Sequence, residues 1–416
     1  MLSLIPNRDR LVGTLETLAT YGYREGHGVT RLSLDPADLA ARRYVVGLLE
    51  EAGLGVRADP VGNLIARRSG ADDSLPPVAT GSHIDTVVEG GKYDGALGVL
   101  GALEAIRLLN EAGIRTRHPL ELIVFTGEEQ GGFHAGTKGS RAMAGKLSPD
   151  DLRAWRDDQG RTFWAALQAA GYHPERLARA VRPPGSLCCF VELHIEQGRV
   201  LADAGARLGV VTAIAGLTTN RVEIRGRADH AGATPMGLRQ DALAAAAEVV
   251  LAVERLARRE ARHGTVGTVG ELRALPGFPA TIPGLVKLWI DTRGVDDASK
   301  QRVLDGTIAA LAEACRRRGL MCERELLVDE LALPMSPQVV DELRAACEDV
   351  GVPPLLLPSG AGHDAQHMAA LGPVGMLFVP SVGGVSHAPE EYTAPEDLCL
   401  GVQVLAHALV RLAGRA

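Results

Sequence analysis

Residues 120–129 have the sequence LELIVFTGEE, and this stretch decides the class of fold. A continuous apolar run of this length is typical of a short strand that is buried on both faces of a sheet. Glu128 and Glu129 follow the run directly, after Thr126 and Gly127. We therefore predict a buried strand whose end delivers two adjacent carboxylates to a loop.

The segments around this run alternate between strand and helix patterns. Asp35 and Pro36 resemble an N-cap and a first helical residue, and they open a helix that runs to Gly53. A second helix pattern covers residues 96–112, with Gly113 just beyond its end. Short strand patterns lie between the helices, at 55–58, 63–66 and 77–82. This alternation predicts an α/β fold with a mostly parallel sheet.

A different pattern begins near residue 213. Half-exposed strands are predicted at 219–226, 285–292 and 321–327, and helices at 241–262 and 299–318. Such an order indicates a smaller α+β unit, with one antiparallel sheet covered by two helices. We therefore predict a main domain in two segments, 1–212 and 330–416, interrupted by an inserted domain at 213–329. Residues 147–185 are more polar, and we predict that they form a helical insertion within the first segment.

Composition narrows the function classes. The chain has 416 residues, with 44 Lys and Arg against 51 Asp and Glu, so its formal charge is −7. Nucleic-acid binding is disfavoured, because contacts to phosphates need a basic surface. No apolar run approaches the ~18 residues of a membrane span, and the first residues lack the apolar core of a signal peptide. Six cysteines without CxxC pairs favour a reduced compartment, so we expect a cytoplasmic protein.

Five short patches combine residue types that ligate metal ions, and each stands where a strand is expected to pass into a loop. They are residues 81–85 with Asp94, residues 126–129, residues 192–198, residues 229–232 and residues 386–391. Imidazole nitrogens and carboxylate oxygens suit zinc, and equally manganese or cobalt, whereas thiolates are absent from the patches. On residue types alone, isolated core histidines and a solvated Glu-Glu turn stay open as alternatives to a metal site.

The spacing within the patches permits a two-metal site. Asp94, in the glycine-rich string GGKYDGALG, has room to bridge two ions, and such a pair clamps a carbonyl oxygen and activates a water. Glu128 and Glu129 then divide the work, one directed to the metal and the other to the water. Asp85, two residues after His83, is expected on the same strand face, where it orients the imidazole.

The strings that carry these residues resemble the M20 peptidase superfamily of metal-dependent amidohydrolases. They are GSHIDTVVEGGKYDGALGV, GSRAMAG, ELHIEQGRVL, HAGATPMGLRQDALAAAAE, SGAGHDA and FVPSVGGVSHAPEEYT, and they span residues 81–393. ELHIEQG and HAGATPM are similar to the hydantoinase/carbamoylase branch, which holds N-carbamoyl-L-amino-acid hydrolases, allantoate amidohydrolases and β-ureidopropionases. The resemblance implies a catalytic α/β domain and an inserted domain that acts as a lid and forms a homodimer.

The resemblance also implies two divalent metal ions in each subunit, zinc in the first place, with manganese, cobalt or nickel as alternatives. The implied ligands are His83, Asp94, Glu129, His194 and His387. Asp94 would bridge the ions. Glu128 would act as the general base that takes the proton of the attacking water.

A set of substrate contacts is implied in the same way. His230, from the inserted domain of either subunit, would polarise the scissile carbonyl. Arg293 would clamp a substrate carboxylate, for which the guanidinium fork is well shaped. The remaining implied contacts are Gln197, Gly360, Ala361, Gly362 and His363.

Two strings depart from the family pattern. Members commonly have N-x-I-P-G before the strand at 285–292, where this chain has Ala280, and alanine cannot supply the amide contact to substrate. The acidic loop often has the pattern E-E-G-S-R-F, whereas residues 128–133 have EEQGGF and no Arg. The metal chemistry is expected to survive both changes, while the choice of substrate becomes open.

We expect an amidohydrolase that cleaves the C–N bond of an N-carbamoyl group on an L-amino acid. Its partners would be a small ureido or amide substrate bearing a carboxylate and a second copy of the chain, not nucleic acid or a membrane. The nearest alternative is the same chemistry on allantoate, ureidoglycolate or β-ureidopropionate. A non-catalytic scaffold is a further alternative, which the complete ligand set disfavours. A true aminopeptidase is another, which fits the metal ligands but not the ELHIEQG string.

Overall fold

Strand β6 (Leu120–Phe125) lies inside the larger sheet of the computed structural model, which describes residues 4–416. Every residue of this strand is buried. It pairs in parallel with β5 (Val78–His83) and antiparallel with β4 (Leu64–Arg68). The prediction of a buried strand that passes into the acidic loop is confirmed.

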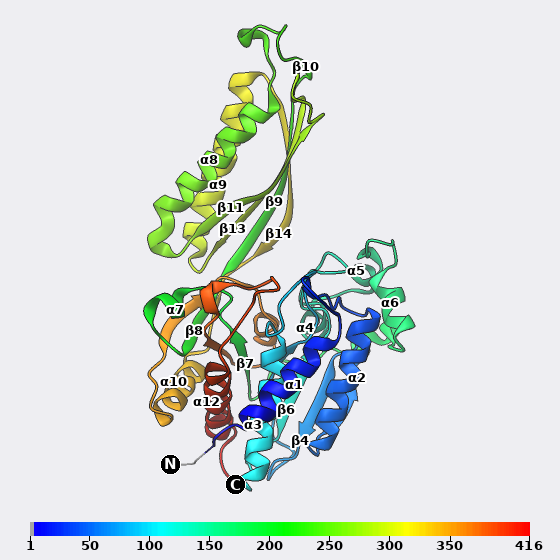
Figure 1. The fold of residues 1–416 in the computed structure, drawn as a ribbon, viewed down its shortest axis with the longest axis vertical. Helices are drawn as coiled ribbons and strands as arrows, with labels where there is room; N and C mark the ends of the chain where they lie inside the picture. The colour runs from blue at the N-terminus through cyan, green and yellow to red at the C-terminus, as the bar shows by residue number, and fades with distance from the viewer. Residues whose placement is uncertain (1–3) are drawn as a thin grey trace. The chain divides into compact units, whose positions relative to one another are not determined.

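The chain divides into two units (Figure 1). The larger unit holds the residues up to Thr212, Met335–Leu357 and Gly362–Ala416, and the smaller unit holds Ala213–Pro334 and Pro358–Ala361. The smaller unit ends at Pro334 rather than at the expected residue 329, for two reasons. Strand β14 (Met321–Glu330) continues past Asp329, and β15 (Leu333–Pro334) pairs with Ile214.

The larger sheet has nine strands in the order β15-β8-β17-β7-β5-β6-β4-β3, with β16 paired to β8. Its further strands are β3 (Gly55–Ala58), β7 (Cys189–Ile195), β8 (Gly209–Ile214), β16 (Leu355–Ser359) and β17 (Val374–Val379). The central strands β17, β7, β5 and β6 are parallel, whereas β4, β3, β8 and β15 join antiparallel. The α/β class is confirmed, and the parallel arrangement holds at the centre of a mixed sheet.

The larger unit also contains ten α-helices within residues 4–416. They are α1 (Arg8–Thr20), α2 (Pro36–Glu51), α3 (Ala96–Glu111), α4 (Lys138–Met143), α5 (Pro149–Ala154), α6 (Phe163–Ala169), α7 (Val200–Ala204), α10 (Pro337–Asp349), α11 (Ala365–Met368) and α12 (Pro395–Ala413). The Asp35 side chain accepts from the Asp38 amide, so the expected N-cap of α2 is present. A two-stranded hairpin, β1 (Tyr23–Arg24) and β2 (Gly28–Val29), precedes α2.

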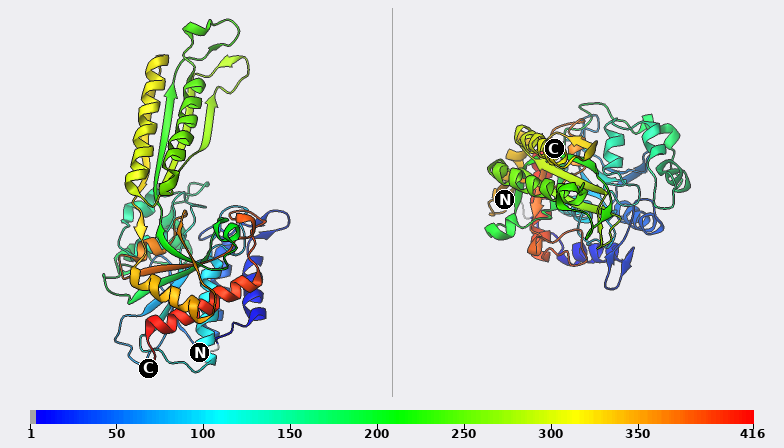
Figure 2. Two further views of the ribbon diagram at one scale, coloured as in Figure 1. Left: turned by 90° about the vertical axis from the view of Figure 1, so that its left-hand side faces the viewer. Right: turned by 90° about the horizontal axis from the view of Figure 1, so that it is seen from above.

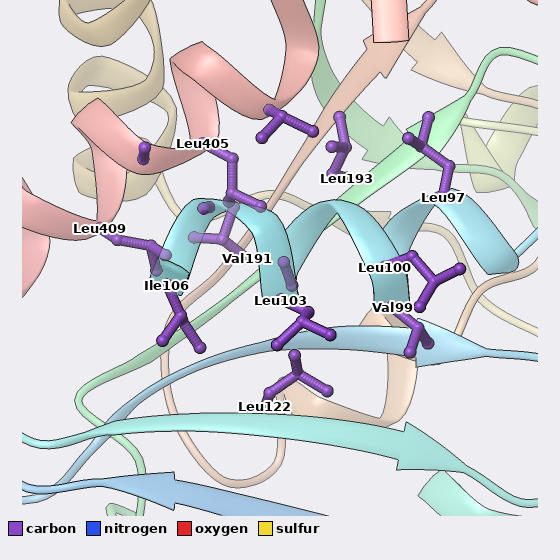
Figure 3. Close-up of a cluster of buried hydrophobic side chains, with 14 of the residues drawn as sticks. Leu97, Val99, Leu100, Leu103, Ile106, Leu122, Val191, Leu193, Leu405 and Leu409 are labelled. Carbon is purple, nitrogen blue, oxygen red and sulfur yellow. The ribbon is translucent and has the colours of Figure 1, made fainter. Parts of the chain in front are cut away.

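Helix α3 is apolar on nearly every side, because it is buried between the sheet and α12. Figure 3 shows Leu103 beside Leu122 of β6, while Leu405 and Leu409 of α12 lie on the opposite side of the helix. Since α3 begins one residue after Gly95, this core also fixes the loop that carries Asp94.

Replacing Leu103 by Ala is expected to lower the free energy of unfolding by about 2–5 kcal/mol, because the side chain is 1% exposed and a cavity would remain. Urea denaturation followed by circular dichroism measures this change. Leu251→Ala is a matched control, since Leu251 is also helical but 62% exposed, and it should change stability by less than about 0.5 kcal/mol. A loss at Leu103 no larger than the control would contradict the core assignment.

The smaller unit has a four-stranded antiparallel sheet in the order β11-β13-β9-β14. Its elements are β9 (Gly216–Arg225), α8 (Ala242–Glu260), β11 (Val266–Leu275), β13 (Leu285–Gly294), α9 (Asp297–Arg318) and β14. Both helices lie over one face of the sheet in Figures 1 and 2, as predicted for this segment. Strand β11 was not predicted, because it is a largely exposed edge strand that contains Gly267 and Gly270 and has little apolar alternation.

A short two-stranded ladder completes the smaller unit. β10 (Asp229–His230) pairs with β12 (Thr281–Ile282), with His230 opposite Thr281.

Among residues 4–416, no helix combines the length and the apolar character that crossing a membrane requires.

Candidate active site

Two predicted ligands lie at the ends of elements that the sheet and the core hold in place. Strand β5 ends at His83, and Asp94 directly precedes Gly95, the N-cap of α3. Gly95 has a φ of 63°, and a Cβ at this position would lie 2.4 Å from atoms of the His83 ring. Glycine is therefore required for the turn that brings Asp94 against the imidazole.

The remaining predicted ligands of the larger unit follow the same edge of the sheet. β7, parallel to β5, contains His194, and β6 leads into the loop that carries Glu129. His387 lies in the loop after β17, the parallel neighbour of β7. The carboxyl ends of parallel strands meet at one edge, where α/β proteins place their ligand sites.

The first group of ligand atoms joins His83, Asp94 and His194, which lie within 4.8 Å of one another and are all buried. Asp94 Oδ1 is 3.2 Å from His194 Nε2 and 3.6 Å from His83 Nε2. The second group joins Asp94, Glu129 and His387. His387 Nε2 is 3.1 Å from Asp94 Oδ2 and 3.4 Å from Glu129 Oε1. Asp94 thus turns one oxygen to each group, which is the arrangement of a bridging carboxylate.

Hydrogen bonds set the tautomers of the two buried histidines. His83 Nδ1 is 2.9 Å from the Asp85 carbonyl oxygen, and His194 Nδ1 is 2.9 Å from the Ile195 carbonyl oxygen. Carbonyl oxygens only accept, so each Nδ1 donates, and each Nε2 is the nitrogen that faces Asp94. A metal ion can take the place of the proton that each Nε2 otherwise shares with Asp94, so two imidazoles and a carboxylate form a donor set that fits a divalent cation.

The charges of the two groups favour the same conclusion. Although burial acts to raise the pKa of Asp94, its hydrogen bonds with His194, His387 and His83 hold that pKa well below the ordinary value. The same carboxylate raises the pKa of His387 to about 9. Burial, together with the charge of Asp94, raises the pKa of Glu129 to about 7. Carboxylates therefore repel one another here, and added positive charge relieves that repulsion.

Glu128 lies beside the first group without belonging to it. Its Oε2 is 3.7 Å from His83 Nε2. Burial raises the pKa of Glu128 well above its ordinary value, and the neighbouring Glu129 adds to the rise against the opposing effect of His83. A carboxylate with a raised pKa, next to the place where a water would be activated, has the properties of a general base.

Asp85 lies against His83 as expected, with its Oδ1 3.8 Å from His83 Nδ1, although the two residues do not lie on one strand face. Strand β5 ends at His83, so the two residues do not share a strand, and the His83 imidazole is held by the main-chain oxygen of Asp85. The Asp85 carboxylate also accepts the Glu128 amide at Oδ1 (3.2 Å) and the Glu129 amide at Oδ2 (3.1 Å). Asp85 therefore fixes the acidic loop.

Glu391 is a site residue that the sequence analysis did not assign. Its Oε1 accepts the amides of Tyr93 (2.9 Å) and Asp94 (3.1 Å), and its Oε2 accepts the Ser386 hydroxyl at 2.8 Å. A Cβ on Gly91 would lie 2.2 Å from this carboxyl group. Glu391 thus ties the Asp94 turn to the loop of His387, and its position in a Glu-Glu pair near His387 was the only sequence signal.

Two predicted substrate residues of the larger unit lie at the metal groups. Gln197 Nε2 donates to Asp94 Oδ2 at 2.7 Å and lies 3.3 Å from His387 Nε2. His363, which follows Gly362, is buried with its ring centroid 4.7 Å from that of His194. Burial, and next the neighbouring His194, lower the pKa of His363 well below its ordinary value, so this imidazole is neutral.

His230 belongs to the smaller unit and is exposed. Its Nδ1 accepts the amides of Gly232 (3.0 Å) and Ala233 (3.1 Å). Because Nδ1 is an acceptor, the neutral imidazole carries its hydrogen on Nε2. The turn therefore makes His230 a hydrogen-bond donor directed away from its own backbone.

Arg293, Gly360 and Ala361 also belong to the smaller unit. Arg293 donates from Nε and Nη2 to the two carboxylate oxygens of Asp291, at 2.9 and 3.1 Å, and from Nη1 to the Gly360 carbonyl at 3.1 Å. In the adjacent turn, Ser359 Oγ donates a hydrogen bond to the Ala361 carbonyl oxygen and accepts one from the Ala361 amide, both at 3.1 Å. These bonds hold the guanidinium in one orientation.

This fold and this site are those of a metal-dependent hydrolase. The model of peptidase family M20/M25/M40 matches residues 79–411. The N-carbamoyl-L-amino acid amidohydrolase of Geobacillus stearothermophilus is 42% identical over 97% of this chain and 98% of its own length. The ureidoglycolate hydrolase of Oryza sativa subsp. japonica is 40% identical over 97% of this chain and 84% of its own.

A solved structure agrees with these relatives. The hydantoinase/carbamoylase family amidase from Burkholderia multivorans superposes with a TM-score of 0.89 at 36% identity, over 99% of both chains. The chain belongs to the M20 peptidase family, in its hydantoinase/carbamoylase branch, and is a hydrolase. The family resemblance predicted from the motifs is confirmed.

Proposed function

We propose that this enzyme hydrolyses the C–N bond of an N-carbamoyl group on an L-amino acid, with the amino acid, ammonia and carbon dioxide as products. One observation carries the proposal: Asp94 turns its two oxygens to two separate ligand groups, beside the partly buried Glu128. The relatives that act on ureido compounds support this choice of substrate class.

The proposal includes two divalent cations in each subunit, zinc first, with manganese, cobalt or nickel as alternatives. His83, His194 and Asp94 would hold one, and Asp94, Glu129 and His387 the other. When bound, such a pair supplies Lewis-acid polarisation of the scissile carbonyl and lowers the pKa of the attacking water. The mixed imidazole and carboxylate donors leave the choice among these metals to experiment.

Glu128 moves the proton in this scheme. Its carboxylate accepts a proton as the water oxygen bonds to the ureido carbon. As the bond from that carbon to the leaving nitrogen breaks, Glu128 returns the proton to the nitrogen. The carbamic acid that remains on the other nitrogen then breaks its C–N bond, which releases carbon dioxide and the second amine. The Asp85 hydrogen bonds to the amides of Glu128 and Glu129 keep the backbone fixed during both transfers.

His230 supports the proposed oxyanion. The amides of Gly232 and Ala233 keep Nδ1 as an acceptor, so that Nε2 is the donor offered to the carbonyl oxygen as its negative charge develops. In the proposal this donor comes from the chain's own smaller unit or from that of a second subunit. Gln197 and the turn at 360–363 complete the substrate contacts.

Arg293→Ala is expected to raise KM for carboxylate-bearing substrates by about 10- to 100-fold, because charge-assisted hydrogen bonds would be lost. KM for a neutral amide analogue should stay nearly unchanged. Steady-state kinetics on both substrates measure the difference. Arg258→Ala, at a solvent-exposed position of α8, is the matched control. Equal effects on neutral and anionic substrates would show that Arg293 is not the clamp.

We further propose a homodimer in which the smaller unit forms the contact, in the cytoplasm. β14 is an edge strand of its sheet, with Met321 and Leu326 at least half exposed, and the unpaired backbone groups of an edge strand favour pairing with another chain. The six cysteines are free, which accords with a reduced compartment. Light scattering after size-exclusion chromatography tests the dimer.

Ammonia release tests the substrate assignment. The panel holds N-carbamoyl-L- and N-carbamoyl-D-amino acids, allantoate, ureidoglycolate, β-ureidopropionate, simple amides and dipeptides. The highest kcat/KM is expected for an N-carbamoyl-L-amino acid. Faster turnover of allantoate or ureidoglycolate would move the assignment to those ureido acids, an alternative favoured by Ala280, which cannot donate an amide hydrogen bond to substrate. Dipeptide cleavage without ureido hydrolysis would indicate an aminopeptidase.

A further inference from the structure

Lys138 lies under the acidic loop and is only 1% exposed. It is the first residue of α4, and its main-chain amide donates to the Gly127 carbonyl at 2.9 Å. Its side-chain Nζ donates to the same carbonyl at 3.3 Å and to the Glu129 carbonyl at 3.0 Å. The ammonium group therefore forms hydrogen bonds to the backbone on both sides of Glu128.

The surroundings of this ammonium group are unusual for a buried charge. Nζ lies 5.7 Å from the centroid of the Phe163 ring. It donates its hydrogen bonds to main-chain carbonyls, and the carboxylates of Asp85, Glu128 and Glu129 attract it from farther away. Burying an ammonium is costly, and here the compensation comes from carbonyl groups of one loop.

Asp85 binds the same stretch of backbone through its N–H groups, and it shares the Gly127–Glu128 peptide group with Lys138. Its carboxylate accepts the amides of Glu128 and Glu129, while Lys138 binds the carbonyls of Gly127 and Glu129. The negative charge thus faces N–H groups and the positive charge faces C=O groups. The dipole of the Gly127–Glu128 peptide group lies between the two opposite charges, and bonds to the neighbouring Glu129 amide and carbonyl restrict the backbone on the other side of Glu128.

We propose that Lys138 is a positioning residue that, together with Asp85, directs the Glu128 carboxylate toward the reacting water. Residues 130–132 of the loop are Gln-Gly-Gly and provide neither a cation nor a stiff backbone, so the restraint has to come from outside the loop. The inference rests on the proposed function in one respect, the role of Glu128 as the base.

Lys138→Met keeps the length and apolar contacts of the side chain and removes its donors. We expect kcat to fall by about 10- to 100-fold, as for other groups that support a catalytic residue, with little change in KM. Lys138→Arg, which keeps charge and donors, should recover part of the loss. Lys300→Met is the matched control, because Lys300 is also buried and also donates to a main-chain carbonyl, that of Glu330. This control should lower the melting temperature without lowering kcat.

A double-mutant cycle separates positioning from general destabilisation. If Lys138 acts through Glu128, Lys138→Met should have almost no further effect on kcat in the Glu128→Gln background. Multiplicative losses in the double variant, or an equal loss in Lys300→Met, would overturn the proposal.

A crystal structure of Lys138→Met provides a readout that needs no substrate. A Glu128 carboxylate displaced while His83 and Asp94 keep their places supports the proposal, and an unmoved Glu128 contradicts it. Absence of turnover by the unmodified enzyme on every panel substrate would instead count against the proposed function, so the two failures can be told apart.

Discussion

Replacing Glu128 by Gln is expected to lower kcat by about 10²- to 10⁴-fold while the metal content of the enzyme stays unchanged. Gln has the shape of Glu and keeps the same main-chain amide bond to Asp85, so the loop should not move. It cannot accept the proton of the attacking water, however. Because Glu128 belongs to neither ligand group, metal binding does not depend on its charge to first order.

Two measurements on the same samples check this expectation. Ammonia release gives kcat, and elemental analysis after remetallation gives the number of ions per chain. Glu175→Gln, at an exposed position of the larger unit, is the matched control and should behave like the unmodified enzyme. Turnover near that of the unmodified enzyme would remove Glu128 from the role of base. Loss of metal together with activity would make it a ligand.

Asp94→Asn should have the largest effect of all on metal binding. Asp94 Oδ1 faces His83 and His194, and Oδ2 faces His387, so a single side chain serves both groups. Asn keeps one oxygen and places an N–H₂ donor where the other oxygen lay, against a histidine nitrogen. We expect metal affinity to fall by more than about 100-fold, the upper range for groups that merely support ligands, and activity to fall with it.

Isothermal titration of the metal-free protein with Zn²⁺ and with Mn²⁺ measures this loss. Asp158→Asn is the control, since its side chain is almost fully exposed. If Asp94→Asn loses one ion and retains the other at full affinity, Asp94 serves one group and not both. The bridging role would then be wrong, although the two groups themselves would stand.

Much of the site was predictable because ligand residues stand where secondary structure ends. The apolar run before Glu128, and the glycine after Asp94, each mark a boundary that local sequence determines. The family motifs then assigned ligand roles to residues that periodicity alone could not separate from core histidines. The N-cap at Asp35 and the helices of the smaller unit were predictable for the same local reasons.

The supporting residues were not predictable, because their partners lie far away in the chain. Glu391 binds the amides of Tyr93 and Asp94 across almost three hundred positions. Asp85 was expected to orient His83 because the two are separated by a single residue, a pattern that holds only while a strand continues. β5 stops at His83, and the side chain of Asp85, which still lies against His83, also binds another loop.

By itself, then, the sequence determined the α/β class, the inserted unit, the family and the identities of the candidate ligands, since these depend on local patterns and on motifs. The tertiary structure alone decided that Asp94 offers one oxygen to each ligand group, that Glu391 ties two loops together, and that Lys138 and Asp85 hold the Glu128 backbone from opposite sides. The physical reason is that hydrogen bonds and charge pairs act over a few ångströms in space. Which side chains come that close is settled only when the strands pair and the core packs.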